Sequence, residues 1–363
     1  MTGNPIDRQS AFTGTRPPSP GLEIDPARLT QYLESHVTGF RGPVSIRQFK
    51  GGQSNPTYRL DAASGAYVLR RKPPGKLLPS AHAIEREFRV MQALCEARFP
   101  VPTVRHLCED PAAIGTAFYL MDHVEGRVIW EPAMPGSEAA ERGAVYGAMI
   151  AALAKLHCFD PAELGLADFG RGEAYVARQI ARWTEQYRAS RTEDVSEMDR
   201  LIAWLPDHVP AQSRVAIVHG DFRLDNLILA DNRPEIRAVL DWELSTLGDP
   251  VADFTYFLMQ WAMPPSESGA GTGSLIGADL AALGIPDMAA AIEAYEAGTG
   301  LSVRPHLDFY LAYNFFRIAA ILQGIVGRVR DGTATNPNAA AMAAQVRPIA
   351  ETAWRFAKRA GAI

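Results

Sequence analysis

The chain has 363 residues, of which 47% are hydrophobic and 21% charged, and its formal net charge at pH 7 is −5. This length and composition predict an ordinary globular protein with two domains or one two-lobed unit. The negative charge argues against a dedicated nucleic-acid binder or a binder of anionic membranes. Three widely spaced cysteines, Cys95, Cys108 and Cys158, make neither a zinc pattern nor a disulfide framework, which favours a cytoplasmic location.

The first 21 residues are polar and rich in proline, serine and threonine. They lack the apolar core of a signal peptide, and their composition is typical of a disordered segment. We therefore expect a disordered arm at residues 1–21, an N-terminal lobe at residues 22–121 and a larger C-terminal lobe at residues 122–363.

The N-terminal lobe mixes strand-like and helical patterns. Residues 44–49 alternate between apolar and polar side chains, as a half-buried strand does, and Ser64-Gly65 supplies a bend between two further strands. Ser80 can cap the helix that follows, which carries apolar side chains near helical spacing. The expected elements are strands at 44–49, 57–60 and 66–70, a helix at 81–98 and a strand at 117–121.

The C-terminal lobe is mainly helical by pattern. Its most apolar stretch, residues 309–329, contains polar side chains such as Asn314 and Arg317, so it fits a buried helix better than a membrane span. Residues 263–273 hold two prolines and three glycines and predict a mobile loop. Helices are expected at 137–158, 173–189, 195–204, 250–261, 306–329 and 338–359.

One segment, residues 215–241, carries polar residues at the edges of strand-like runs. A β-branched run ends in His-Gly-Asp at Asp221, and two further short strands flank a polar turn. A hairpin of these two strands would place Asn226, at the start of one, beside Asp241, at the end of the other. A carboxylate and an amide oxygen suit Mg²⁺. Asp221 would then face a reacting hydroxyl and take its proton.

These residues resemble the aminoglycoside phosphotransferase and choline kinase-like family, whose members are protein-kinase-like enzymes that act on small molecules. The motifs that carry the resemblance are His219-Gly220-Asp221-x₄-Asn226, Leu240-Asp241-Trp242-Glu243 and Gly248-Asp249-Pro250-x₂-Asp253. Residues 67–75 and 84–87 are similar to the kinase-like domain fused to some acyl-CoA dehydrogenases. The resemblance implies a bilobal α+β fold of the protein-kinase type, with a small N-terminal antiparallel β-sheet lobe and a larger, mainly helical C-terminal lobe.

The resemblance also implies roles for individual residues. Asp221 would be the catalytic base, and Asn226 and Asp241 would be the ligands of Mg²⁺. His219 would be a scaffold residue of the catalytic loop, and Asp253 would anchor that loop by accepting backbone hydrogen bonds. The implied reaction is ATP-dependent phosphorylation of a hydroxyl group, of the kind that a hydroxyacyl-CoA carries.

By the same resemblance, the N-terminal lobe would bind the nucleotide. Gly51, Gly52, Ser54 and Asn55 lie in a turn between two strands, where glycines let backbone N–H groups approach phosphate oxygens and a polar side chain can add a donor. The turn lacks the full G-x-G-x-x-G of protein kinases, and the chain has no Walker A motif. Residues from Met121 to Val124 would form the hinge that meets adenine.

A cation on a strand and a carboxylate on a helix complete the expected nucleotide site. Arg70 occupies the place of the protein-kinase lysine, and its planar fork can contact phosphate. Arg71 and Lys72 are alternatives, and strand alternation places Arg70 and Lys72 on one face and Arg71 on the other. Glu87 is the expected carboxylate partner, with Glu85 as the second candidate.

The small-molecule acceptor is less well defined by the sequence. Residues 304–363 carry eight Lys or Arg and three Asp or Glu, a surplus of five positive charges that favours an anionic acceptor such as a CoA ester. An aminoglycoside kinase, an amino-alcohol kinase and a non-catalytic nucleotide-binding module are the alternatives. The sequence decides neither between ATP and GTP nor the oligomeric state.

Overall fold

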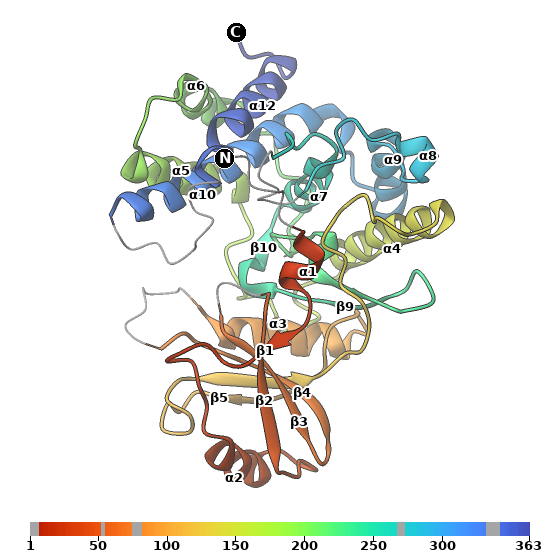
Figure 1. Cartoon of the computed structure of the whole chain (residues 1–363). Coiled ribbons are helices and arrows are strands. Elements are labelled where there is room, and N and C mark those ends of the chain that lie inside the picture. Colours follow the sequence, from red (N-terminus) through yellow and green to blue (C-terminus); the bar gives the residue numbers. More distant parts are fainter. Residues whose placement is uncertain (1–6, 52–54, 75–81, 267–272, 332–341) are drawn as a thin grey trace.

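Two lobes make up the protein in the computed structural model, which describes residues 7–51, 55–74, 82–266, 273–331 and 342–363. The sheet lobe lies at the bottom and the larger helical lobe at the top of Figure 1. This arrangement confirms the expected α+β fold, in which a small antiparallel sheet lobe precedes a mainly helical lobe.

The sheet lobe is built on one antiparallel sheet of six strands in the order β1-β2-β3-β4-β6-β5. Successive side chains point to opposite faces of such a sheet. One face packs on helix α2 (Pro26–His36), and the other faces helix α3 (Ile84–Glu96) and the helical lobe. The strands are β1 Thr15–Arg16, β2 Val44–Phe49, β3 Thr57–Ala62, β4 Gly65–Arg71, β5 Val104–Cys108 and β6 Phe118–Asp122.

The sequence patterns did not predict α2 or β5. A signal for α2 exists, because Asp25 accepts hydrogen bonds from two N–H groups of the first turn and Pro26 occupies the first helical position. Helix α3 begins at Ile84 instead of residue 81, and its expected cap, Ser80, lies outside the described residues.

The expectation of a disordered arm is wrong for residues 7–21, and residues 1–6 lie outside the described part of the chain. Residues Arg8–Phe12 form helix α1, which Asp7 caps by accepting from the Ser10 N–H. Strand β1 pairs with β2 and forms one edge of the sheet. In Figure 1, α1 lies between the two lobes. Contacts with residues far along the chain order this arm, and composition alone does not report such contacts.

Helix α10 (Leu307–Arg330) runs through the helical lobe and packs against α5 (Tyr175–Ser190), α7 (Pro250–Leu258) and α12 (Val346–Arg359). Among the described residues, only the stretch Arg304–Arg330 is long and apolar enough to cross a membrane, and 78% of its most apolar window is buried in the fold. Such burial is typical of a core helix. Further helices among the described residues of this lobe are α4 Ala139–Cys158, α6 Ser196–Trp204, α8 Leu280–Leu283 and α9 Met288–Thr299.

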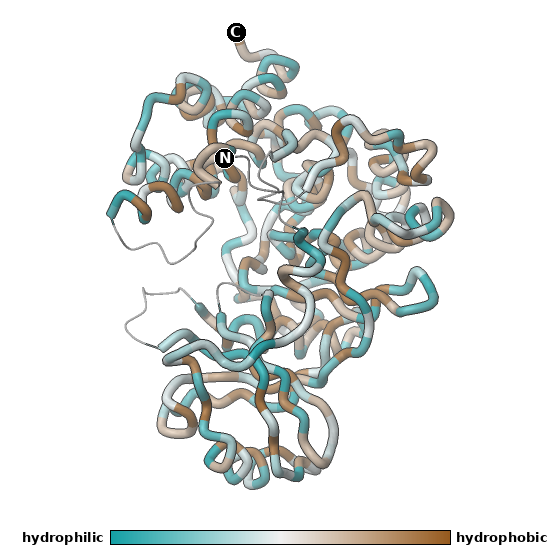
Figure 2. The backbone as a smooth tube through the Cα atoms, viewed as in Figure 1, coloured by the Kyte–Doolittle hydropathy of each residue, from teal (hydrophilic) through white to brown (hydrophobic). Residues whose placement is uncertain are grey.

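Two short antiparallel ribbons lie where the helical lobe faces the sheet lobe. Strand β7 (Ala216–Val218) pairs with β10 (Thr246–Gly248), and β8 (Leu227–Leu229) pairs with β9 (Ile236–Val239). Nearly all of these strand residues are buried and apolar, whereas the turns between elements are more polar, as the colours of Figure 2 show. Most of the loop predicted at 263–273 lies outside the described residues, since 267–272 are not described.

Candidate active site

The β8–β9 hairpin brings the two expected metal ligands to one edge. Leu227 pairs with Val239, and the Leu240 N–H donates a 2.8 Å hydrogen bond to the carbonyl oxygen of Asn226. Asp241 follows directly and has a left-handed backbone conformation, with φ of 63°. Aspartate adopts this conformation more readily than most residues, because its short side chain can form local hydrogen bonds.

Asp221 lies in the loop after β7, with 20% of its side chain exposed. One carboxylate oxygen accepts a 2.5 Å hydrogen bond from the Tyr256 hydroxyl, and the other accepts one of 3.1 Å from Nδ2 of Asn226. Asn226 also donates to the backbone carbonyl of Asp221, so the amide and the carboxylate are held together. A carboxylate that is fixed in orientation and partly exposed can accept the proton of a bound hydroxyl.

His219 links this loop to the strand that ends at Asp241. Its Nε2 lies 2.8 Å from the carbonyl oxygen of Leu240, and its Nδ1 lies 3.2 Å from the backbone nitrogen of Asp221. A neutral imidazole with its proton on Nε2 satisfies both contacts, donating to the carbonyl and accepting from the N–H. The contacts are those of a scaffold residue, as expected.

Asp253 holds the same loop from α7. Its carboxylate accepts from the N–H groups of His219 at 2.7 Å and Gly220 at 2.8 Å, and Nε2 of His157 lies 3.1 Å away. Burial acts to raise the pKa of Asp253, but the hydrogen bonds that its carboxylate accepts from His157 and from the backbone N–H of His219 contribute to an overall lowering of that pKa. The expected anchoring by Asp253 is confirmed in these contacts.

Arg70 connects the two lobes. Its Nε lies 2.9 Å from Glu87 on α3, and one terminal nitrogen lies 2.8 Å from Asp241 and 3.1 Å from Glu243. Burial disfavours its charge, but Glu87 and Asp241 outweigh this effect and raise the pKa of Arg70, so the guanidinium stays charged. The ion pair expected between Arg70 and Glu87 is therefore present.

The alternatives to Arg70 have other partners. Arg71 lies on the opposite face of β4, with its guanidinium 5.3 Å from the centre of the Tyr58 ring. Lys72 pairs with Glu85 at 3.0 Å. Of these three cations, Arg70 is the one that joins the α3 carboxylate to Asp241, just after β9, and its contact with phosphate stays a prediction.

The glycine turn is described only at its ends. Gly52 and Ser54 lie outside the described residues. A Cβ atom at Gly51 would lie 3.2 Å from the Trp130 ring, so glycine permits this close approach. Asn55 differs from expectation, because it is fully buried and its amide contacts Glu87 at 3.1 Å and His82 at 2.8 Å. Its side chain supports the Arg70–Glu87 pair, so its amide donor already has a partner within the protein.

The expected hinge residues lie at the junction of the lobes. Met121 is buried in β6 between Val68 and Val104 of the neighbouring strands. Val124 is half-buried in the segment that leaves the sheet. This placement is compatible with a hinge, and contact with adenine stays a prediction.

Arg223 is a charged residue of the site that sequence analysis missed. Its Nε lies 3.1 Å from Asp221, and a terminal nitrogen lies 3.2 Å from Asp225. Burial disfavours its charge, but Asp221 and Asp225 outweigh burial and raise the pKa of Arg223. Its position, two residues after Asp221 within the motif, is the sequence signal that could have identified it as a site residue. This side chain places a permanent positive charge beside the carboxylate.

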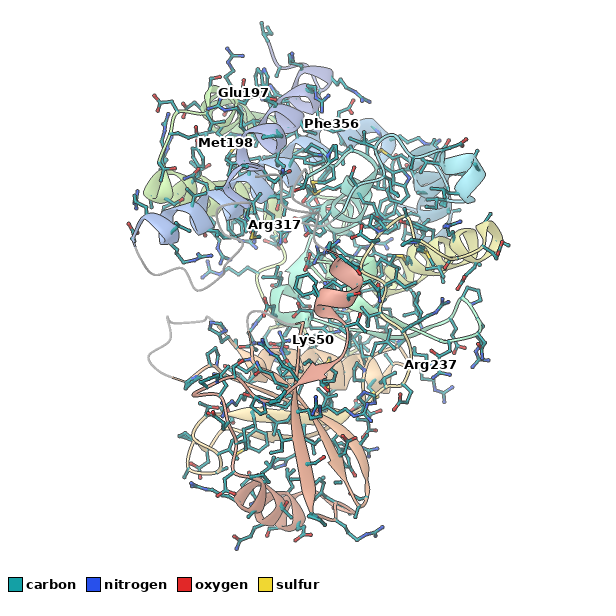
Figure 3. The ribbon with its side chains drawn as sticks, viewed as in Figure 1. Lys50, Glu197, Met198, Arg237, Arg317 and Phe356 are labelled. Atoms are coloured by element: carbon teal, nitrogen blue, oxygen red, sulfur yellow. The ribbon has the colours of Figure 1, made fainter. Side chains whose placement is uncertain are left out.

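Arg317 of α10 reaches the same loop, although the sequence analysis counted it only as part of a charge surplus. It donates a 2.9 Å hydrogen bond to the Gly220 carbonyl and lies over the ring of Tyr256, and Figure 3 shows it on the side of the helical lobe that faces the sheet lobe. Four other cations of this C-terminal region pair with exposed or half-buried carboxylates instead: Arg304 with Glu296, Arg330 with Asp331, Arg347 with Glu193, and Arg359 with Asp308. The charge surplus therefore does not converge on Asp221.

Comparison with known proteins agrees with this geometry. The sequence pattern of the phosphotransferase enzyme family matches residues 45–313, well over half of the chain. The chain belongs to this family. The chain is 45% identical to acyl-CoA dehydrogenase family member 10 of Mus musculus, over 96% of the chain and 32% of the mouse protein. It is 38% identical to acyl-CoA dehydrogenase family member 11 of Homo sapiens, over 94% of the chain and 44% of the human protein. The chain spans less than half the length of these relatives.

Solved structures share the fold of this chain. A crystal structure from Ralstonia eutropha, provisionally assigned as an aminoglycoside phosphotransferase, is 46% identical with a TM-score of 0.83 and covers 93% of this chain and 99% of its own. Choline kinase of Cryptosporidium parvum is 12% identical with a TM-score of 0.55, over 93% and 95% of the two chains. Spectinomycin phosphotransferase, solved with ADP and spectinomycin, is also 12% identical with a TM-score of 0.61, over 93% and 99%. The last two similarities concern the fold alone.

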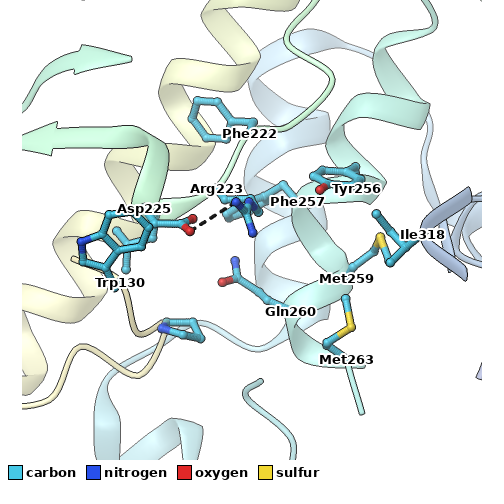
Figure 4. Close-up of a pocket in the computed structure, with 12 residues that line it drawn as sticks. Trp130, Phe222, Arg223, Asp225, Tyr256, Phe257, Met259, Gln260, Met263 and Ile318 are labelled. Atoms are coloured by element: carbon cyan, nitrogen blue, oxygen red, sulfur yellow. Dashed lines mark ion pairs between the residues drawn. The ribbon is translucent and has the colours of Figure 1, made fainter. Parts of the chain in front are cut away.

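A pocket opens beside the loop that carries Asp221 (Figure 4). It encloses about 450 Å³, including the part open to solvent. Arg223 and Asp225 form an ion pair at one side, and Gln260 adds an amide. The other described residues that line it are apolar or aromatic: Trp130, Pro132, Phe222, Leu224, Tyr256, Phe257, Met259, Met263 and Ile318.

The donor set at the β8–β9 edge fits Mg²⁺. The described residues contain no group of three or more His, Cys, Asp or Glu that could hold a metal ion by themselves. Mg²⁺ in nucleotide sites commonly takes one or two protein oxygens and completes its shell with phosphate oxygens and water. The Asp241 carboxylate and the Asn226 amide oxygen supply that number. Arg70 would share Asp241 with the metal.

Proposed function

We propose that the protein transfers the γ-phosphoryl group of ATP to a hydroxyl group of a small molecule, with Mg²⁺ as cofactor. The observation that carries this proposal is the network around Arg70, which joins Glu87 of the sheet lobe to Asp241 of the catalytic hairpin. In-line phosphoryl transfer requires a cation on the phosphates, a metal site and a base in one place.

The residues of this chain divide the work. Asp221 orients the acceptor hydroxyl and accepts its proton, while Tyr256 and Asn226 fix the direction of the carboxylate. Arg223 places a positive charge where negative charge develops on the transferred group. When bound, Mg²⁺ held by Asn226 and Asp241 would neutralise phosphate charge.

For the acceptor, we propose a hydroxyl on a mainly apolar chain, such as that of a hydroxyacyl-CoA. The apolar lining of the pocket beside Asp221 supports this class, because an acyl chain gains about 0.8 kcal/mol per buried methylene. Among the described lining residues Asp225 is the one carboxylate, and it is paired with Arg223. The described lining offers few negative charges to pair with the ammonium groups of a polycationic aminoglycoside. The anionic character of the acceptor and the cytoplasmic location stay predictions.

The test is an ADP-release assay that compares hydroxyacyl-CoA esters with aminoglycosides and amino alcohols, preceded by thermal unfolding with ATP and Mg²⁺. We expect Mg²⁺-dependent stabilisation by ATP and the fastest ADP release with a hydroxyacyl-CoA. Stabilisation without release for any acceptor would favour a non-catalytic nucleotide-binding module. Release with an aminoglycoside alone would overturn the acceptor proposal and retain the kinase.

A further inference from the structure

Arg8, in the N-terminal arm, has the contacts of a site residue. Only 6% of it is exposed. One terminal nitrogen donates a 2.6 Å hydrogen bond to the Trp130 carbonyl and lies 3.7 Å from Glu131, and the other lies 3.3 Å from Asp225. A charged side chain is rarely buried to this degree unless it is paired. The location of Arg8 therefore depends on its partners in the helical lobe.

Asp225 connects Arg8 to the reacting centre. Its Oδ2 is shared between Arg8 at 3.3 Å and Arg223 at 3.2 Å, and its side chain is 6% exposed. Arg223 in turn contacts Asp221. The side chains thus form a row of alternating charge, Arg8, Asp225, Arg223 and Asp221, that runs from the arm to the carboxylate expected to act as base.

The arm also ties the sheet lobe to the pocket wall. Strand β1 extends the sheet, whereas Gln9 contacts the helical-lobe side through the Val128 carbonyl at 2.9 Å and the Trp130 N–H at 3.2 Å. The Phe12 ring lies 4.9 Å from that of Trp130, which lines the pocket. Trp130 is also the residue that Gly51 of the glycine turn approaches. Helix α1 therefore lies where the glycine turn and the pocket meet.

We propose that Arg8 is a positioning residue for phosphoryl transfer, which neutralises Asp225 and so leaves the charge of Arg223 available to the transferred group. The inference rests on the proposed function. Without Arg8, Arg223 is the one remaining ion-pair partner of Asp225 among the described residues and is drawn toward it. Arg223 would then stabilise the transferred group less well, because electrostatic stabilisation depends on a fixed orientation.

The test uses the full chain and four variants. Arg8→Ala removes the cation and Arg8→Lys keeps it. The double variant Arg8→Ala/Asp225→Asn removes both charges of the pair. Arg16→Ala, an exposed arginine of the same arm, is the matched control. Hydrogen exchange of residues 222–226 is measured without nucleotide, and kcat and KM are measured with ATP and the best acceptor of the screen.

We expect Arg8→Ala to increase exchange at residues 222–226 and to lower kcat about tenfold with little change in the KM for ATP. Arg8→Lys and the double variant should recover much of the loss, because the first keeps the cation and the second removes the charge that draws Arg223 away. Removing a second charge would not rescue a merely structural role. Arg16→Ala should match the wild type. The proposal is overturned if Arg8→Ala equals Arg16→Ala in both measurements, or if the double variant is worse than the single one. If Arg8→Ala does not fold, the double variant decides: the proposal requires it to keep most of the kcat of Arg16→Ala, and a loss of about tenfold or more would overturn the proposal. Altered exchange without phosphoryl transfer in the wild type would contradict the proposed function alone.

Discussion

On one side of Asp221, charged groups are linked into a network, whereas the surface on the other side is mainly apolar. On the first side Arg70 contacts three carboxylates. The described side chains of this network therefore have partners within the protein itself. On the second side the pocket offers aromatic rings, methionines and one paired carboxylate. The first side suits a ligand recognised by charge and fixed geometry. The second suits one recognised by shape and apolar area.

This difference explains how one fold can keep its chemistry while its acceptor changes. Charge networks tolerate few substitutions, because removing one member leaves another buried without a partner. Apolar pockets change their preference by small steps, since one methylene alters binding by only about 1–3 kcal/mol. Three substitutions test whether the two sides behave in these separate ways.

The largest effect is expected at the residue between the two sides. Asp221→Asn keeps an acceptor for the Tyr256 hydroxyl but removes the base, and general-base catalysis contributes about 10²–10⁴-fold to a rate. We expect kcat to fall within that range while thermal unfolding and ATP binding stay close to wild type. A kcat within threefold of wild type would show that Asp221 is not the base.

A smaller effect, confined to the charged side, is expected for Asp241→Asn. Loss of this carboxylate should raise the Mg²⁺ concentration needed for half-maximal activity by about 10–100-fold. Glu243→Gln is the matched control, because it removes another carboxylate partner of Arg70. If both variants raise the Mg²⁺ concentration needed for half-maximal activity equally, Asp241 acts through Arg70 and not through the metal.

The smallest effect is expected on the apolar side. Met263→Ala removes buried apolar area from the pocket wall and should cost about 1–2 kcal/mol, or about tenfold in kcat/KM for the acceptor. The KM for ATP should not change. Ile276→Ala, at an exposed site, is the control. A change in the KM for ATP that equals the change for the acceptor would contradict the separation of the two sides.

The parts that sequence predicted well are local. The β8–β9 hairpin follows from two short apolar runs around a polar turn, and its pairing places Asn226 and Asp241 at the same edge. Arg70 could be separated from Arg71 by strand alternation, because side-chain direction in a strand has a period of two. The burial of Asn55 against Glu87 could not be predicted in this way, because it depends on how α3 packs on the sheet.

The parts that sequence missed are non-local. Arg8 and Asp225 are 217 residues apart. The short polar arm has no apolar pattern from which the burial of Arg8 could be predicted. The pocket likewise gathers residues from the segment at Trp130, the catalytic loop, α7 with the turn after it, and α10. No single stretch of sequence reports such a surface, which is why the acceptor stayed the least determined part of the function.

The bonds around Gly220 also have a consequence for motion. Asp253 accepts from its N–H and Arg317 donates to its carbonyl, so the loop that carries Asp221 is tied to both α7 and α10. Arg127 exchanges two backbone hydrogen bonds of 2.9 Å with Leu229, which ties the connection from the sheet lobe to β8. We therefore expect any rotation of the sheet lobe to pivot in the segment between Asp122 and Arg127. The N-terminal arm spans that pivot, because β1 pairs with β2 of the sheet lobe while Arg8 pairs with Asp225 of the helical lobe.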